Sequence, residues 1–179
     1  DCVRAGLDKI VPWKPDVIFS GCNAGYNAGM DIIYSGTVSA ALEGVILGIP
    51  SVAVSARWVK GQCRYDTAAA VAKKIFDKVK KPFLSSAKPM VLNINVPYLD
   101  EEDLKGLRVA EIGSNAYDYY FEEEIEGERR LTLKGRSTME HLSGTDRYYL
   151  ERDYVTVTPV VYGMADREEM DRLKSWLDD

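Results

Sequence analysis

The chain has few of the residues that mark specialised classes of protein. Its 179 residues include three cysteines and a single histidine. Cys2, Cys22 and Cys63 match neither a zinc-ligand spacing nor the even count of a disulfide framework, so we expect a reduced, cytoplasmic protein. The longest apolar runs, such as residues 45–54, are too short to span a bilayer, and no membrane partner is expected.

Positive charge is also scarce. Lys and Arg total 23 against 28 Asp and Glu, which gives a net charge of −5, and no block of basic residues occurs. No nucleic-acid groove is therefore expected, because such a groove normally needs a basic stripe. The remaining composition, with 46% hydrophobic and 28% charged residues, is typical of one globular domain.

The first hundred residues alternate between helical and extended patterns. Residues 1–11 have the spacing of a helix, with an apolar face made by Val3, Leu7, Ile10 and Val11. Five further segments with clear patterns are a strand over 16–20, a helix over 35–48, a strand over 51–55, a helix over 65–81 and a strand over 90–96. The inward residues expected on the two long helices are Val38, Ala41, Leu42, Val45 and Ile46, and Ala69, Ala72, Ile75, Phe76 and Val79.

The expected strands are apolar on both faces, which is typical of a parallel sheet covered by helices on each side. Residues 1–100 are therefore predicted to form an α/β core, a three-layer sandwich around a parallel sheet. After residue 107 the pattern changes to strands, with a hairpin that turns at Glu126–Gly127 and places the acidic residues 122–124 opposite Arg129 and Arg130. Residues 107–179 are thus predicted to form a β-rich arm and a C-terminal helix, and the arm is suited to dimer contacts.

The stretch from Ser20 to Gly44 holds five glycines and two asparagines between an apolar strand and an apolar helix. In parallel α/β sheets, ligands bind beyond the carboxyl ends of strands, where this loop lies. Ser35, Gly36 and Thr37 stand at the start of a helix, where backbone N–H groups and hydroxyls can hold a phosphate. The loop also offers neutral oxygens for a divalent metal, Mg²⁺ or Mn²⁺, from two asparagines: Asn23 and Asn27.

Each of these residues also has a purely structural explanation. Serine at a helix start is commonly an N-cap, glycine a turn residue, and asparagine a residue that tolerates left-handed backbone. The loop matches neither G-x-G-x-x-G nor G-x-x-x-x-G-K-[ST], so it predicts neither a dinucleotide fold nor a P-loop.

Five other side chains are weaker candidates. His141 is a general-acid candidate for a leaving nucleoside, although a surface or hydrogen-bonded histidine is the simpler interpretation. A capping or turn carboxylate explains Asp146 equally well. Asp31 and Glu43 can act through water, with Glu43 more typical of a helix residue, and Cys22 is expected to be an inert buried thiol.

The chain closely resembles the survival protein SurE family in the segment PDVIFSGCNAGYNAGMDIIYSGTVSAALEGVILGIPSVAVS. Further stretches resemble it as well: YDTAAAVA, LNINVP, GTDRYYLERDYVTVTP and the terminal WL, so the resemblance covers residues 1–179. It implies a Rossmann-type three-layer sandwich and a metal-dependent phosphomonoesterase that acts on nucleoside monophosphates, a 5′/3′-nucleotidase. It also implies a homodimer or homotetramer that uses the hairpin of residues 114–136 and the C-terminal helix.

The same resemblance implies roles for the loop residues. Asn23 matches the family's asparagine metal ligand, Asn27 assists, and Ser35, Gly36 and Thr37 match its phosphate-contacting turn. The family's Asn-Asp-Asp-Gly segment, whose aspartates hold the metal, is not in this sequence. We therefore expect an N-terminally incomplete chain that is inactive alone; the alternative is a non-catalytic phosphate-binding or assembly module.

Overall fold

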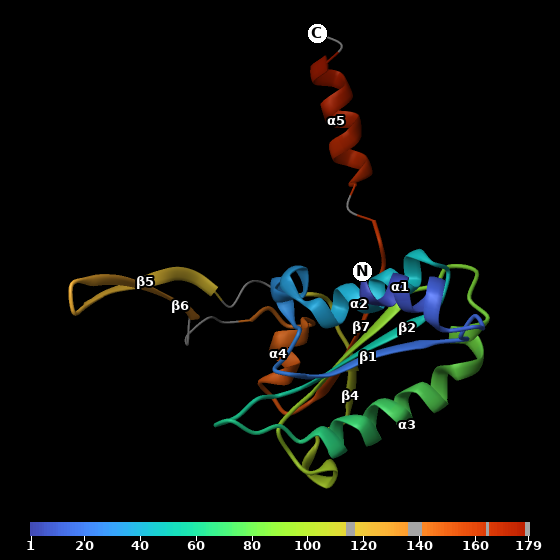
Figure 1. Cartoon of the computed structure of the whole chain (residues 1–179), viewed down its shortest axis with the longest axis horizontal. Helices are drawn as coiled ribbons and strands as arrows, with labels where there is room; N and C mark the ends of the chain where they lie inside the picture. Colours follow the sequence, from blue (N-terminus) through green and yellow to red (C-terminus); the bar gives the residue numbers. More distant parts are fainter. Residues whose placement is uncertain (114–116, 136–140, 164, 178–179) are drawn as a thin grey trace.

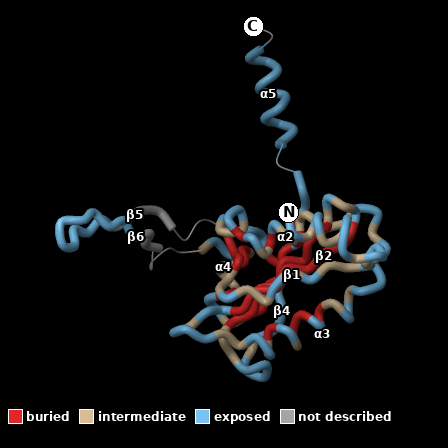
Figure 2. Tube along the Cα trace, viewed as in Figure 1, coloured by how far each residue is buried: buried red, intermediate tan, exposed pale blue. Residues whose placement is uncertain are grey.

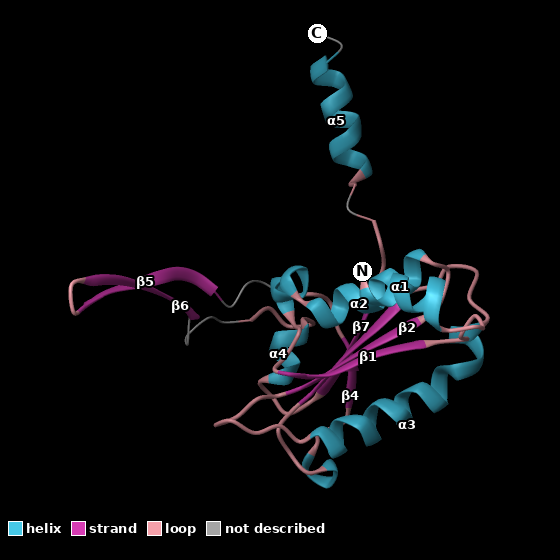
Figure 3. Ribbon diagram, in the orientation of Figure 1, coloured by secondary structure: helices cyan, strands magenta, loops and turns pink. Residues whose placement is uncertain are grey.

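The computed structural model describes residues 1–113, 117–135, 141–163 and 165–177. These residues form a three-layer α/β sandwich with helices on both faces of a central sheet (Figures 1 and 3). In the described chain the central sheet has the strand order β1-β2-β3-β7-β4. The bounds of these strands are Ile18–Ala24 for β1, Ser51–Ala56 for β2, Val91–Val96 for β3, Val155–Val160 for β7 and Leu107–Val109 for β4.

The sheet is mixed in direction. Strands β1, β2 and β3 run parallel, which confirms the predicted parallel core for this part of the chain. Strand β7 runs antiparallel to β3, and β4 runs parallel to β7, so two strands from residues 107–179 join the predicted parallel core and make the sheet mixed. The reason is their connection: β7 follows a long excursion through the hairpin, and the handedness rule for β-α-β crossovers does not apply to it.

Helices divide between the two faces of the sheet. On one face lie α1 (Cys2–Ala5), its continuation η1 (Gly6–Ile10) and α2 (Gly36–Ile46), and on the other lies α3 (Tyr65–Leu84). The larger core cluster joins α3 to the residues of β2 and β3 that face it, such as Val54 and Ile94. A smaller cluster joins α2 to the opposite side of the same strands. Figure 2 shows the buried sheet between these layers.

Three residues predicted to be buried on helices are exposed instead. Ile10 is 76% exposed because η1 is a π-helical turn, whose wider spacing carries Ile10 away from the Val3–Leu7 face. Ile46 is exposed at the last turn of α2. On α3 it is Ala68, and not Ala69, that is buried against the sheet.

The hairpin and the last helix extend away from the sandwich (Figure 1). Strands β5 (Tyr117–Ile125) and β6 (Glu128–Gly135) pair antiparallel, with Glu124 opposite Arg129 and Glu123 opposite Arg130, which confirms the predicted register. Helix α5 (Arg167–Leu177) leaves its apolar stripe exposed. The ends of the predicted hairpin, residues 114–116 and 136, lie outside the described residues.

Three short elements complete the described chain: η2 (Gly29–Tyr34), η3 (Glu101–Asp103) and α4 (Asp146–Leu150). Helix α4 lies where the sequence analysis assigns no element, and its N-cap is Thr145, whose side chain accepts from the Tyr148 N–H. Across the described ranges, no helix combines the length and the apolar character that a bilayer crossing needs.

Candidate functional site

The candidate site lies at the carboxyl ends of the parallel strands. Asn23 near the end of β1 is in register with Ser55 on β2, and Ser55 with Asn95 on β3. The loop that leaves β1 leads to the start of α2. Figure 1 shows α4 near this same end of the strands. This is the edge at which ligands bind in open α/β sheets, as the sequence predicts for the glycine-rich loop.

The Asn23 side chain is half-buried and fixed by one hydrogen bond. Its Nδ2 donates to the carbonyl oxygen of Gly25 at 2.9 Å. This orientation leaves Oδ1 without a donor among the described residues, so the amide oxygen is the atom available to a ligand. The position is compatible with the predicted role of Asn23 as a metal ligand.

Gly21 places β1 unusually close to its neighbour just before Asn23. Its φ is +124°, and a Cβ built there would lie 2.3 Å from the carbonyl oxygen of Val54. The pairing of β1 with β2 shifts register between Ser20 and Asn23. A glycine is therefore required at this point of the loop, because any side chain would collide with the backbone of β2.

Asn27 is buried and ties the loop to the sheet. Its backbone N–H donates to Asn95 Oδ1 at 2.8 Å, and its carbonyl oxygen accepts from Asn93 Nδ2 at 2.8 Å and from Asn95 Nδ2 at 3.0 Å. Its own Nδ2 donates to Ser55 Oγ at 2.6 Å. Asn27 thus anchors the loop above β2 and β3, and its predicted contact with substrate stays a prediction.

The predicted phosphate turn forms the start of α2. Ser35 is the buried N-cap, and its Oγ accepts from the Val38 N–H at 3.1 Å. Gly36 is exposed and Thr37 is half-buried, and their backbone N–H groups belong to the first helical turn, which has no intrahelical acceptor for them. These two N–H groups, with the positive end of the helix dipole, can bind an anion.

Asp146 organises the far end of the loop. It is fully buried, and its Oδ2 accepts from the Gly29 N–H at 2.8 Å. Its Oδ1 accepts from the N–H groups of Gly113 at 2.9 Å and Arg147 at 2.7 Å. The carboxylate therefore binds backbone from three separate segments, which makes it a positioning residue and not a group that faces a ligand.

Arg147 is a residue that the sequence did not single out. Its Nη2 donates to the carbonyl oxygen of Ala28 at 2.9 Å and also to Asp31 Oδ2. Burial raises the pKa of the Asp31 carboxyl, and the charge of Arg147 acts against that rise. Asp31 is thus engaged in a loop-to-α4 ion pair. The only sequence signal for Arg147 is its place beside Asp146 in the GTDR stretch.

The other weaker candidates have structural partners. His141 Nε2 lies 3.1 Å from Glu151 Oε1, in agreement with a hydrogen-bonded histidine. Glu43 faces α1, where its Oε1 is 2.5 Å from Arg4 Nε, so it belongs to the helix surface as expected. Cys22 is half-buried and not fully buried as expected, although burial still raises the pKa of its thiol and so lowers the thiolate fraction.

The described residues supply only part of a metal site. Asn23 offers one neutral oxygen, whereas Mg²⁺ and Mn²⁺ normally bind carboxylates as well. Nowhere in the described ranges do three or more histidine, cysteine, aspartate or glutamate side chains come together as a metal-binding group. By themselves these residues do not fit a divalent cation.

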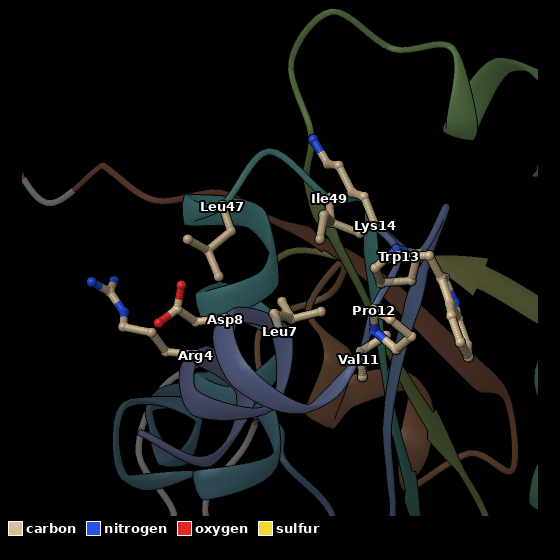
Figure 4. Close-up of a pocket in the computed structure, with 10 residues that line it drawn as sticks. Arg4, Leu7, Asp8, Val11, Pro12, Trp13, Lys14, Leu47 and Ile49 are labelled. Atoms are coloured by element: carbon tan, nitrogen blue, oxygen red, sulfur yellow. The ribbon is translucent and has the colours of Figure 1, made fainter.

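One cavity lies far from this site and another lies beside it. The larger, of about 690 Å³, lies at the opposite ends of the strands, between η1, the chain before β1 and the end of α2 (Figure 4). A second, of about 320 Å³, lies beside the loop after β1. The lining of the second includes Gly25, whose carbonyl oxygen accepts from Asn23 Nδ2. The residues that line the larger cavity and are labelled in Figure 4 are Arg4, Leu7, Asp8, Val11, Pro12, Trp13, Lys14, Leu47 and Ile49.

Comparison with known proteins gives matches along the whole chain. A family model described as "Survival protein SurE" matches residues 1–119. The protein is 44% identical over 168 residues to a 5′-nucleotidase SurE of Clostridium botulinum, an alignment that covers 92% of this chain and 66% of the relative. It is 42% identical over 179 residues to a 5′-nucleotidase SurE of Clostridium tetani, covering 98% of this chain and 70% of the relative.

A solved structure agrees with these relatives. The crystal structure of a SurE protein from Aquifex aeolicus matches with a TM-score of 0.83 and 35% sequence identity, over 100% of this chain and 72% of that chain. The chain spans slightly less than two thirds of the length of the Clostridium botulinum relatives. With the glycine-rich loop, the three-layer fold and the family model all in agreement, this chain belongs to the survival protein SurE family.

Proposed function

We propose that this chain is the substrate-holding part of a phosphomonoesterase that acts on nucleoside monophosphates, a 5′/3′-nucleotidase. The observation that carries the proposal is the first turn of α2, where the N–H groups of Gly36 and Thr37 have no acceptor within the helix, at the end of the loop that holds Asn23. Relatives that are 38–44% identical bear the name 5′-nucleotidase SurE, which supports the same chemistry.

The phosphate group of the substrate is bound by the start of α2 in this proposal. The N–H groups of Gly36 and Thr37 donate to phosphate oxygens, and the Thr37 hydroxyl adds a third donor. Ser35 contributes by capping the helix through the Val38 N–H, a bond that does not use the N–H groups of Gly36 and Thr37. Asn27 contributes by holding the loop on the sheet through Ser55 and the two asparagines of β3. These contacts bind and orient the phosphate.

We further propose that the activity depends on a divalent metal, Mg²⁺ or Mn²⁺, with the Asn23 amide oxygen as one ligand. A bound metal of this kind supplies an activated water and neutralises charge on the phosphoryl group. The remaining ligands have to come from outside the described residues, since the described part of the chain holds no acidic cluster near Asn23. Metal binding and turnover by this chain alone are therefore expected to be weak.

Assembly and location are proposed on separate grounds. We propose a homodimer or homotetramer that forms through the β5–β6 hairpin and α5, because both extend from the sandwich and α5 exposes apolar side chains. We propose a cytoplasmic protein, because Cys2, Cys22 and Cys63 are all free.

The test is phosphate release from AMP, GMP, CMP and UMP, with and without Mn²⁺. It compares this chain with a version extended before Asp1 by a segment that carries the Asn-Asp-Asp-Gly motif implied by the family resemblance. We expect Mn²⁺-dependent release from the extended version, lowered by Asn23→Ala and by Thr37→Ala but unchanged by Ser39→Ala, an exposed hydroxyl on the same helix. No release from the extended version, together with retained phosphate binding, would instead support a non-catalytic phosphate-binding or assembly module.

A further inference from the structure

A cavity of about 320 Å³ opens beside the loop that carries Asn23. This volume lies in the range of pockets that hold small organic ligands. Three elements form its walls: the loop after β1, the residues that follow β2, and α4. They contribute respectively Gly25 and Tyr26, Arg57 and Trp58, and Arg147 and Glu151.

The cavity is coupled to the candidate site by two hydrogen bonds of the same residue. The carbonyl oxygen of Gly25 accepts from Asn23 Nδ2 at 2.9 Å, and the Gly25 N–H donates to the carbonyl oxygen of Ala56 at 2.8 Å. Ala56 directly precedes Arg57. The wall of the cavity and the amide of Asn23 are thus joined through Gly25, so a ligand bound at the Asn23 amide lies beside this cavity.

The chemistry of the walls suits a flat heterocycle. Trp58 is 59% exposed, so a large aromatic face is open to a ligand. The Tyr26 hydroxyl is buried beside the Arg57 guanidinium, and no hydrogen bond of standard geometry joins it to a described residue. Buried Leu150 closes the cavity. An aromatic surface with a few polar groups is the usual arrangement for stacking and hydrogen bonding of a base.

The charges of the walls favour a neutral ligand over a second phosphate. Arg147 is already paired with Asp31 and with the carbonyl oxygen of Ala28. Glu151 brings a carboxylate to the wall, which repels an anion and offsets the charge of Arg57. A neutral group with hydrogen-bond donors and acceptors therefore fits these walls better than an anionic group.

We propose that this cavity binds the base of the nucleoside monophosphate, with Trp58 stacking on the ring and Arg57 and Tyr26 hydrogen-bonding to its edge. The proposal rests on the phosphate site assigned to α2 under the proposed function. A neighbouring cavity of about 240 Å³, lined by Phe19 and Phe76, lies on the α3 side of β1 and has a mainly apolar wall. It offers less hydrogen bonding to the edge of a base.

The experiment measures binding to the full chain by isothermal titration with Mn²⁺ present. The ligands are the four common nucleoside monophosphates and ribose 5-phosphate, which has the sugar and phosphate but no base. We expect at least one nucleotide to bind about tenfold more tightly than ribose 5-phosphate, as base stacking on an aromatic side chain normally gives. Trp58→Ala removes this difference and Trp58→Phe keeps part of it. The matched control is Trp13→Ala, a tryptophan of similar exposure, 68%, at the opposite end of the sheet, and it leaves the difference unchanged.

Equal binding of nucleotides and ribose 5-phosphate by the unmodified chain would overturn the proposal, as would a preference that survives Trp58→Ala. The hydrolytic proposal fails separately. If the chain prefers nucleotides through Trp58 but its extended version releases no phosphate, the base cavity is supported and the phosphatase activity is rejected. If the extended version releases phosphate from AMP and from ribose 5-phosphate with the same kcat/KM, and Trp58→Ala does not change either value, the phosphatase activity is supported and the base cavity is rejected.

Discussion

Asp146 Oδ2 accepts a hydrogen bond from the backbone N–H of Gly29 at 2.8 Å, although the two residues are 117 positions apart. The same carboxylate also accepts from the N–H groups of Gly113 and Arg147. A buried carboxylate with three N–H donors is strongly held, because hydrogen bonds to a charged group contribute more than neutral ones. This one side chain therefore links the ligand-binding loop to α4 and to the segment after β4.

The first prediction concerns this carboxylate. Asp146→Asn replaces one acceptor by an NH₂ group that faces backbone donors, and we expect the free energy of unfolding to fall by about 1.5–3 kcal/mol. The matched control is Asp153→Asn, whose carboxylate pairs with Lys105 at the surface, and its effect should stay within about 0.5 kcal/mol. Urea denaturation of both variants measures the difference, and equal effects would contradict the anchoring role.

The second prediction concerns the Asp31–Arg147 pair. Burial raises the Asp31 pKa above its ordinary value of 3.8, and Arg147 limits that rise. Arg147→Met should therefore raise the Asp31 pKa further, as followed by NMR of the side-chain carboxyl carbon. A raised folded-state pKa means that the folded state binds the proton more tightly. The contribution of Asp31 to stability is then complete below pH 3.8 and is lost as the pH rises through the folded-state pKa.

The direction in which the Asp31 pKa shifts tests whether Arg147 stabilises the carboxylate. A fall of the Asp31 pKa in Arg147→Met would show that Arg147 does not stabilise the carboxylate. Lys105→Met is the control, since Lys105 pairs with Asp153 and should leave the Asp31 titration unchanged.

The third prediction separates two costs at glycines of the loop. Gly21 and Gly25 both have positive φ, 124° and 113°, but only a Cβ at Gly21 would meet backbone, 2.3 Å from Val54 oxygen. Gly25→Ala should lower the free energy of unfolding by about 1–3 kcal/mol through backbone strain alone. Gly21→Ala should lose about 1–3 kcal/mol more through the collision, and it should also weaken ligand binding because Asn23 lies only two residues further along β1. Equal losses in thermal or urea unfolding would contradict the close approach of β1 and β2.

Local patterns predicted much of the fold and part of the site. The Ser35 cap, the strands of the parallel core and the pairing of Glu124 with Arg129 follow from short spacings. Contacts between distant segments could not be predicted in this way. Nothing in the sequence around Asn27 indicates that its partners are Asn93 and Asn95. Likewise, nothing around Gly29 indicates that its N–H donates to Asp146.

The direction of β7 and the existence of α4 were missed for a related reason. Strand β7 is reached after the hairpin, so its apolar pattern fixes that it is a strand but not which way it runs. Helix α4 is only five residues long, Asp146–Leu150, and too short for a helical period to show. Its stability comes from the Thr145 cap and the Asp146 contacts, which depend on the fold.

The last prediction concerns assembly through α5. Leu173 and Trp176 are exposed on the same stripe of this helix, and such a surface is normally covered by a partner. Leu173→Glu places a charge in that stripe and should shift the protein toward smaller species, measured by size-exclusion chromatography with light scattering. Ser175→Glu adds the same charge beside the stripe and is the control, expected to leave the assembly unchanged. If both variants and the unmodified protein have the same mass in solution, α5 does not carry the contact, because a glutamate cannot be buried at an apolar interface without loss of affinity.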